Sequence, residues 1–381
     1  MCSQTLNFSC DSVGSSDQLS NRFQFIINSQ LIISRCFFRV PFVYIYQFAC
    51  VLQLFFPQPG CLQNKLPGLP TIFLGSVTTE VIKISNHDTM SLRNGGHVRW
   101  AFDLASWRPC LTDLLLATSC IQPEEKARLA KFVFRDDFNA SLIGRLMMRR
   151  FVHLATGLQY DQIQFDRDLK GKPYLKNEGY VIDFNVSHQG RYSVLAGLVT
   201  ARDELTDRRA PKIGVDVMKI EYSGGKPLGE FFRLMNRNFS DDEWRYIKGQ
   251  PTEAEQLEAF MRNWCLKESY VKNVGVGITV DLRKISFSIA SKVLDTKKVV
   301  CDSKLKLNDE LLKDWRFEES LIDKDHCVAV ALENFPLDAD LSENCFEVIG
   351  FDTLVEGHKP LLAIDENYCD GIINKEYKKS K

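Results

Sequence analysis

The sequence predicts an α+β protein made of two halves of similar plan. Strand-like and helix-like runs follow in the order strand, helices, strands, and this order occurs twice along the 381 residues. A charged segment, residues 201–211, separates the two series and is predicted to be the joint between the halves. Hydrophobic residues make up 45% and charged residues 25%, which is ordinary for a soluble globular chain.

The first half is predicted to begin with a strand, residues 99–105, followed by a short helix, residues 112–120. Gln122-Pro123-Glu124-Glu125 indicates a helix start, because proline and acidic residues suit a first turn. A longer helix, residues 136–155, is expected to end at Gly157. A polar loop then leads to two strands rich in Val, Ile, Tyr and Phe, residues 180–186 and 192–199.

The second half restarts with a strand, residues 212–218, in which alternate positions are apolar. Short helices follow, and capping boxes at Ser240 with Glu243 and at Thr252 with Glu255 each indicate a helix start. The helix after Thr252 is expected to end at Gly275. The predicted closing strands are residues 285–289, 315–318 and 327–332. The apolar patch 346–354 in the polar tail is predicted to dock back on the body.

These elements give four segments: an extension, residues 1–89; a first half, residues 90–205; a second half, residues 206–334; and a tail, residues 335–381. The extension holds nine charged residues and an apolar run of 17 residues without a charge, residues 40–56. A signal-anchor, a disordered extension and a mispredicted gene start are the alternatives. We favour a gene-model artefact, because well-patterned sequence follows Met90.

Composition excludes several classes. A net charge of −1 gives no general reason to expect a nucleic-acid partner. The twelve cysteines include no C-x-x-C pair and there are six histidines, so a zinc module is not indicated. Scattered cysteines suggest reduced thiols in a cytosolic protein. No stable membrane association is expected.

Charged residues interrupt a predicted buried helix face. The spacing i, i+3, i+4, i+7 of one apolar stripe is met by Leu257, Phe260, Met261 and Trp264. Glu268 and Lys272 continue that stripe, and a buried charge must be paired, bound to a metal or catalytic. The alternative is a weakly stabilising surface pair at i and i+4.

Asp216 supplies a second carboxylate from the strand that starts the second half, beside Gly214. Together with Glu268 it could hold a divalent cation, and oxygen-only ligands favour Mg²⁺. Otherwise Asp216 is a solvent-facing residue at a strand end. No G-x-x-x-x-G-K-[ST] phosphate loop is present.

With these pieces placed, the chain resembles the 4′-phosphopantetheinyl transferase superfamily. The resemblance rests on five motifs in family order, which are Gln122-Pro123-Glu124-Glu125-Lys126, Gly171-Lys172-Pro173, Asn185-Val186-Ser187-His188-Gln189-Gly190, Gly214-Val215-Asp216 and Trp264-x-x-Lys267-Glu268-Ser269-x-x-Lys272. It implies two pseudo-symmetric halves with the active site in the cleft between them. The implied activity transfers the phosphopantetheine arm of coenzyme A to a carrier-protein serine and releases adenosine 3′,5′-bisphosphate.

The resemblance also implies roles for residues. Asp216 and Glu268 would hold Mg²⁺, Glu268 would be the base for the serine, and Lys272 would contact the attacked phosphate. Coenzyme A would be bound by Arg128, Arg167, Lys170, Gly171, Lys172, Asn185, Ser187, His188 and Gln189. Of these, Arg128, Ser187 and His188 are expected around the 3′-phosphate and adenine, and Gln189 near the metal shell. Arg145, Arg149 and Arg150 are predicted to form a solvated helix face.

One position departs from the pattern of bacterial relatives, which often place a second acid where Met218 stands here. A thioether is a poor Mg²⁺ ligand, so we expect water at that coordination place. The implied substrates are carrier domains of a fatty-acid synthase, a mitochondrial carrier and an aminoadipate-type reductase, acted on by a cytosolic monomer. The alternatives are a non-catalytic coenzyme A or carrier-binding module, and a membrane-tethered interaction protein relying on residues 40–56.

Overall fold

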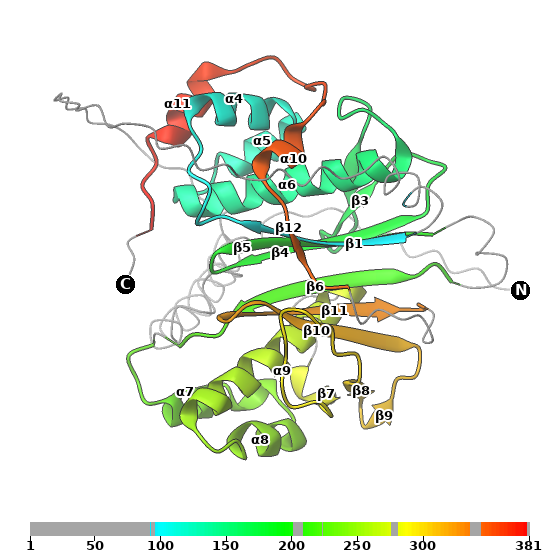
Figure 1. The fold of residues 1–381 in the computed structure, drawn as a ribbon, viewed down its shortest axis with the longest axis vertical. Helices are drawn as coiled ribbons and strands as arrows, with labels where there is room; N and C mark the ends of the chain where they lie inside the picture. Colours follow the sequence, from blue (N-terminus) through cyan, green and yellow to red (C-terminus); the bar gives the residue numbers. More distant parts are fainter. Residues whose placement is uncertain are drawn as a thin grey trace, which may run out of the picture. The chain divides into compact units, whose positions relative to one another are not determined.

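Two small β-sheets face each other, and each carries one long helix on its outer side (Figure 1). The computed structural model describes residue 92 and residues 96–200, 209–222, 224–275, 281–335 and 344–378. The hypotheses about residues 1–89 and most of the joint proposed at residues 201–211 fall outside these ranges. The mixture of helix and sheet agrees with the predicted α+β class.

The first sheet has the strand order β12-β1-β5-β4. Strands β1 (Gly96–Asp103), β5 (Tyr192–Val199) and β4 (Ile182–Gln189) are antiparallel, and β12 (Glu347–Val348) joins β1 in parallel. Helices α4 (Leu111–Ser119), α5 (Pro123–Leu129) and α6 (Arg135–Thr156) precede β4. The predicted polar loop connects two short paired strands, β2 (Phe165–Arg167) and β3 (Pro173–Leu175).

The second sheet has the order β10-β11-β6, all antiparallel. Its strands are β6 (Lys212–Lys219), β10 (Trp315–Asp323) and β11 (His326–Glu333). Between β6 and β10 come α7 (Leu228–Leu234), the 3₁₀ turn η3 (Asn236–Asn238), α8 (Asp241–Lys248) and α9 (Glu253–Val274). A small sheet of β7 (Ile285–Ser288), β8 (Lys304–Leu307) and β9 (Glu310–Leu311) follows the turn η5 (Leu282–Lys284).

The two halves share their connectivity. In each, a first strand leads through helices to a long helix and then to a hairpin, whose last strand pairs with the first: β1 with β5, and β6 with β11. Helices α6 and α9 are both 22 residues long. Both end at a glycine in the left-handed region, Gly157 at φ 80° and Gly275 at φ 63°, as the sequence predicts. Both predicted capping boxes of the second half, Ser240 with Glu243 and Thr252 with Glu255, are present.

A second core lies between the sheets, separate from the core beneath α6. Its side chains come from one face of each sheet and are aliphatic in the main, with Val194, Ala196 and Leu198 of β5 meeting Ile213, Val215 and Val217 of β6. Arg99 of β1 also crosses to Glu318 of β10, donating two hydrogen bonds of 2.7 and 3.0 Å with both side chains buried. The layers therefore run α6, first sheet, second sheet, α9 (Figure 1).

The C-terminal segment folds onto the first half. The prediction that the patch 346–354 docks is confirmed, because β12 pairs with β1 and Ile349 and Leu354 join the core beneath α6. Helix α10 (Phe351–Val355) carries Leu354, and beyond the patch helix α11 (Glu366–Ile373) brings Cys369 and Ile372 into the same core. Docking therefore extends past the predicted patch. The sequence did not predict this part, because two buried side chains in a short helix leave too faint a pattern to detect.

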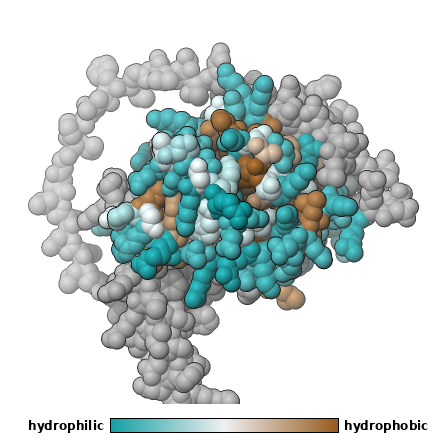
Figure 2. Space-filling model, turned by 90° about the horizontal axis from the view of Figure 1, so that it is seen from below, coloured by the Kyte–Doolittle hydropathy of each residue, from teal (hydrophilic) through white to brown (hydrophobic). Residues whose placement is uncertain are grey.

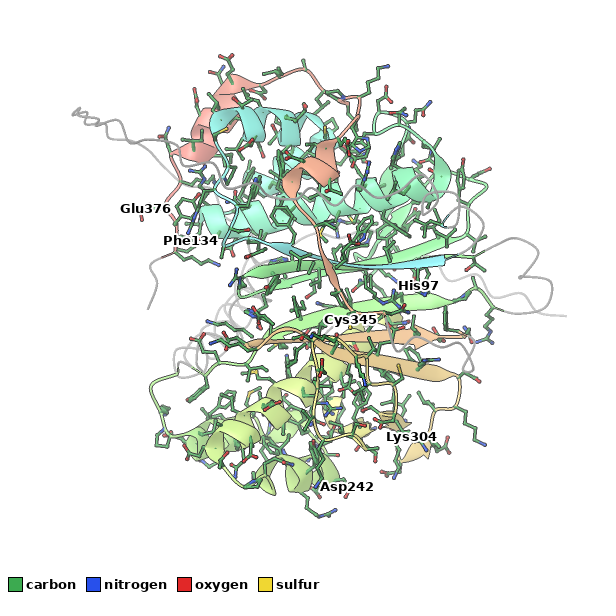
Figure 3. The ribbon with its side chains drawn as sticks, in the orientation of Figure 1. His97, Phe134, Asp242, Lys304, Cys345 and Glu376 are labelled. Carbon is green, nitrogen blue, oxygen red and sulfur yellow. The ribbon has the colours of Figure 1, made fainter. Side chains whose placement is uncertain are left out.

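Figure 3 shows two places where this segment meets the body. Near His97 of β1, the segment carrying Cys345 passes close by, and Asn344 Nδ2 lies 3.2 Å from His97 Nε2. Close to Phe134, the backbone oxygen of Glu376 accepts a 2.9 Å hydrogen bond from the amide of Arg135.

The visible described surface is largely hydrophilic, with small and separate hydrophobic patches (Figure 2). Among the helices that the structure describes, none combines the length and apolar character needed to cross a bilayer.

Candidate active site

Helix α9 crosses strand β6 at Gly214, where the two backbones touch. A Cβ on Gly214 would lie 2.2 Å from the backbone oxygen of Ser269 and 2.5 Å from the backbone nitrogen of Asn273. The Asn273 side chain donates hydrogen bonds of 3.0 Å to the carbonyl oxygens of Lys212 and Ala331, which fixes the crossing. Only glycine permits so close an approach. The first residue of the Gly-Val-Asp motif therefore sets the distance between strand and helix beside the predicted site.

Asp216 is buried at this crossing, with 1% of its surface exposed. Its Oδ1 accepts hydrogen bonds from Lys272 Nζ at 2.6 Å and from Ser187 Oγ at 2.8 Å. Lys272 Nζ also donates to Ser187 Oγ at 2.6 Å. The interpretation of Asp216 as a solvent-facing strand end is wrong, because the carboxylate lies in a closed triangle with a cation and a hydroxyl.

The two oxygens of the Asp216 carboxylate differ in their hydrogen bonding. Asp216 Oδ2 is buried and has no hydrogen-bond partner within the described part of the chain. A buried carboxylate oxygen without a partner costs free energy, so an orphan of this kind calls for a ligand. A divalent cation that prefers oxygen suits that position.

Glu268 occupies the face of α9 that meets Asp216. Three residues earlier, Cys265 Sγ donates to the backbone oxygen of Asp216 at 3.1 Å, and four residues later Lys272 reaches its carboxylate. Residues three and four apart share a helix face, so Glu268 projects between these two contacts. Its side chain is half-buried. Burial raises the pKa of Cys265 well above its usual value, which keeps this thiol neutral beside the carboxylates.

No third carboxylate joins the two predicted cation ligands, Asp216 and Glu268, in the described ranges. Met218 is 3% exposed on β6, two residues beyond Asp216. In the described ranges, no group of three or more His, Cys, Asp or Glu side chains could together hold a metal ion. The residues present fit Mg²⁺, which commonly takes one or two protein carboxylates and keeps several waters.

Strand β4 joins β6 through its side chains. Asp183 Oδ2 accepts a hydrogen bond from the amide of Ile213 at 2.7 Å, and Asn185 Oδ1 accepts one from Val215 at 3.0 Å. Gln189 Oε1 accepts one from the amide of Lys219 at 2.6 Å. Alternate residues of β4 therefore face the edge of β6. Asp183, Asn185 and Gln189 bond its backbone amides, and Ser187 bonds the side chain of Asp216.

The contacts between β4 and β6 involve two residues that were expected to bind coenzyme A. The side-chain oxygens of Asn185 and Gln189 are engaged with backbone amides of β6. Gln189 Oε1 keeps one lone pair with which it could still extend a metal shell. His188 lies between Ser187 and Gln189 on β4, and its side chain is exposed.

The loop after β2 reaches the second half. Lys170 Nζ donates to the carbonyl oxygen of Val274, at the last residue of α9, at 3.1 Å. Lys172 Nζ lies 2.9 Å from Asp183 Oδ2 and donates to the carbonyl oxygen of Ile213 at 3.1 Å. Gly171, at φ 89°, makes the turn between these lysines. The predicted loop therefore connects both strands of the junction with the C-terminal end of α9.

Arg128, Arg145 and Arg167 form a cluster of positive charge in the first half. Burial lowers the pKa of Arg167 to about 10, with further lowering by the positive charges of Arg145 and then Arg128. Glu125, which is 7% exposed, lies 3.3 Å from Arg145 Nε, and its negative charge and that of Asp168 oppose this lowering of the Arg167 pKa. Cations held near one another lower each other's pKa, and an anionic ligand relieves that repulsion.

The prediction of a solvated arginine face on α6 is wrong. Arg149 is completely buried and Arg150 is 8% exposed, while the Arg145 side chain is 15% exposed. Arg149 donates to the carbonyl oxygens of Tyr160 and Ile163 at 2.9 and 3.0 Å, so its charge is used in holding a loop. Helical spacing alone does not distinguish arginines that bond buried carbonyls from arginines in water.

Lys267 of the Trp-x-x-Lys-Glu-Ser motif has a structural role. Its ammonium and the carboxylate of Glu243 are both fully buried and lie 2.8 Å apart. Lys267 also donates to the carbonyl oxygens of Leu282 at 2.8 Å and of Ile285. The motif therefore places a buried ion pair on one side of α9 and the candidate site on the other.

Comparison with known proteins gives the same family for both halves. Residues 105–200 match the family model "4′-phosphopantetheinyl transferase, N-terminal", and residues 212–331 match that of the "4′-phosphopantetheinyl transferase superfamily". The chain is 38% identical over 292 residues to the L-aminoadipate-semialdehyde dehydrogenase-phosphopantetheinyl transferase of Xenopus laevis, covering 74% of this chain and 93% of that protein.

More distant proteins agree. The protein of the same name from Homo sapiens is 37% identical over 287 residues, which is 72% of this chain and 90% of the human one. A phosphopantetheinyl transferase of Thraustochytrium sp. is 32% identical over 247 residues, 63% of this chain and 80% of its own length. The chain belongs to the 4′-phosphopantetheinyl transferase superfamily.

Proposed function

We propose that this enzyme moves the 4′-phosphopantetheine arm of coenzyme A onto a serine of acyl carrier proteins or domains, which converts them from the apo to the holo form. The observation that carries the proposal is the buried Asp216 carboxylate, which has one oxygen bonded to Lys272 and the other without a hydrogen-bond partner in the described ranges, opposite the helix α9 that carries Glu268. A module that only bound coenzyme A would have no need of an orphaned carboxylate and a second acid at one place.

Asp216 and Glu268 are the residues proposed to hold Mg²⁺. When bound, the ion would neutralise the coenzyme A pyrophosphate and so favour charge build-up on the departing phosphate. Glu268 accepts the proton of the carrier serine, directly or through a water, because the hydroxyl attacks poorly while it keeps that proton. Lys272 exchanges its contact with Asp216 for an oxygen of the attacked phosphate, and there stabilises negative charge.

The nucleotide end of coenzyme A is proposed to lie along the first half. Arg128 and His188 supply groups for the 3′-phosphate and adenine, and the loop of Arg167, Lys170, Gly171 and Lys172 follows the nucleotide. The shared connectivity of the halves supports a pseudo-symmetric pair with coenzyme A between them. A single chain with both halves needs no second subunit to complete such a site, so we propose a monomer.

The carrier substrates are proposed to include an aminoadipate-type reductase, which the printed names of the animal relatives indicate. Carrier domains of a fatty-acid synthase and a mitochondrial carrier are proposed as further substrates, in a cytosolic enzyme. Activity on several apo carriers would support this breadth, and activity on one alone would contradict it.

The test is incubation of the full chain with coenzyme A, Mg²⁺ and an apo carrier protein, followed by intact mass spectrometry of the carrier. We expect a mass gain equal to the phosphopantetheine arm, and its loss in Glu268→Gln. Arg245→Gln is the matched control, because that side chain is 76% exposed on α8 and pairs with the exposed Asp242 on the same helix. Binding of coenzyme A without any mass gain in wild type would instead favour the non-catalytic module.

A further inference from the structure

The hydroxyl of Ser187 is hydrogen-bonded to Asp216, one of the two carboxylates proposed to hold the metal. The residue is 6% exposed, its Oγ donates to Asp216 Oδ1 at 2.8 Å, and it accepts from Lys272 Nζ at 2.6 Å. A serine hydroxyl has one hydrogen to donate. While that hydrogen is given to Asp216, it is not available to a phosphate oxygen of the nucleotide.

We infer that Ser187 is a positioning residue for Asp216, which fixes the orientation of the carboxylate and so the place at which its free oxygen meets the cation. The inference rests on the proposed function for its metal, and it assigns Ser187 a role different from the nucleotide contact that the family resemblance implies. Ser187 and Lys272 together fill Oδ1, and Oδ2 is the oxygen left over. The side-chain torsion of a carboxylate is broad, so without these two donors the carboxylate plane could rotate, and with them the free oxygen is held in one place.

The need for Ser187 is greatest during turnover. The side chain of Lys272 is 23% exposed, and the proposed mechanism moves its ammonium from Asp216 to the substrate phosphate. Ser187 is short, lies on a paired strand and has no such second task. It therefore keeps a hydrogen bond to Oδ1 after the lysine has left, and the carboxylate stays oriented.

Side chains that orient a metal ligand in this way typically contribute about 10–100-fold to metal affinity. The predicted effect of Ser187→Ala is a rise of that size in the dissociation constant of the metal, with little change in the preference for coenzyme A over 3′-dephospho-coenzyme A. Ser187→Thr keeps a hydroxyl and should restore most of the affinity.

The experiment measures Mn²⁺ binding by electron paramagnetic resonance, with the full chain saturated with coenzyme A and no carrier protein, so that no turnover occurs. Kinetic constants for coenzyme A and 3′-dephospho-coenzyme A are measured alongside. Ser193→Ala is the control, because Ser193 is a buried serine on the adjacent strand whose Oγ donates to Ala140 O at 3.1 Å, on the α6 side. That variant should bind Mn²⁺ as wild type does.

Weakened Mn²⁺ binding in Ser187→Ala, with recovery in Ser187→Thr, supports the assignment. Unchanged Mn²⁺ binding together with a lost preference for the 3′-phosphate overturns it and makes Ser187 a nucleotide ligand. Equal weakening in Ser187→Ala and Ser193→Ala also overturns it, since that pattern means a general loss of packing. Failure of wild type to modify any apo carrier would refute the proposed function, whereas the Mn²⁺ comparison would still decide the role of Ser187.

Discussion

Replacing Gly214 by alanine should damage the enzyme through a single added carbon. The new Cβ would stand 2.2 Å from Ser269 O and 2.5 Å from Asn273 N, and both obstacles are backbone atoms of α9. Because non-bonded atoms prefer about 3.5 Å or more, helix and strand must separate by about 1 Å. Overpacking of this kind costs roughly 1–3 kcal/mol. We expect the upper end here, since backbone cannot rotate aside as a side chain can.

The same shift acts on the site. Lys272 and Asp216 come from the two elements that separate, and their 2.6 Å contact would lengthen beyond hydrogen-bonding range. A displacement of about 1 Å at reacting groups lowers the rate on the order of 100-fold. Differential scanning calorimetry should show a melting temperature about 3–6 °C lower, because 1 kcal/mol corresponds to about 1–2 °C in a protein longer than 250 residues.

Gly371→Ala is the matched control for this variant. Gly371 lies in the exposed interior of α11 and a Cβ there meets nothing within 4 Å. Alanine is the better helix former, so this variant should gain about 0.5–1 kcal/mol and keep its activity. If Gly214→Ala melts and turns over like wild type, the argument that this glycine sets the distance between β6 and α9 is wrong.

Other variants test other parts of the structure. Lys267→Met leaves Glu243 buried without its partner and should cost about 3–5 kcal/mol in denaturant unfolding, whereas the double variant with Glu243→Leu should recover much of it. Arg145→Ala should raise KM for coenzyme A about 10-fold, because loss of a hydrogen bond to a charged group costs about 1.5 kcal/mol. The variant should also prefer coenzyme A over 3′-dephospho-coenzyme A less strongly than wild type does. An unchanged KM would mean that Arg145 does not help the cluster of Arg128, Arg145 and Arg167 to bind coenzyme A. The kinetic control is Arg245→Ala, because that side chain is exposed. Ile372 is 2% exposed in the core beneath α6, so Ile372→Ala should lower the free energy of unfolding by about 2–4 kcal/mol although the residue lies far along the chain from the site. A loss below about 1 kcal/mol would mean that α11 is not part of the core.

Local patterns predicted much of this fold because they act over a few residues. The capping boxes, the terminal glycines of α6 and α9, and the apolar stripe through Phe260 and Trp264 all appear as expected. The order of strands and helices follows from the same signals. The stripe also led to Lys272, whose contact with Asp216 the structure contains.

The local sequence could not predict which distant residues bond to one another. Whether Ser187 bonds a phosphate or a carboxylate depends on how β4 lies beside β6, and its partner is 29 residues away. The burial of Arg149 depends on carbonyl oxygens in a loop that follows the helix. Residue type gives hydrogen-bonding capacity, whereas the tertiary arrangement decides which group uses it.

The docking of the C-terminal segment constrains how the molecule is made. Ile349, Leu354 and Ile372 fill the core of the first half, yet the ribosome adds them after the whole second half. The first half therefore emerges with an apolar gap that stays open until synthesis is nearly finished, and the nascent chain must avoid aggregation for that time. Lys126 of α5 gains its ion pair with Asp365 at the same late stage. A ribosome that stops early would release a protein with a complete second half and an unfinished first half.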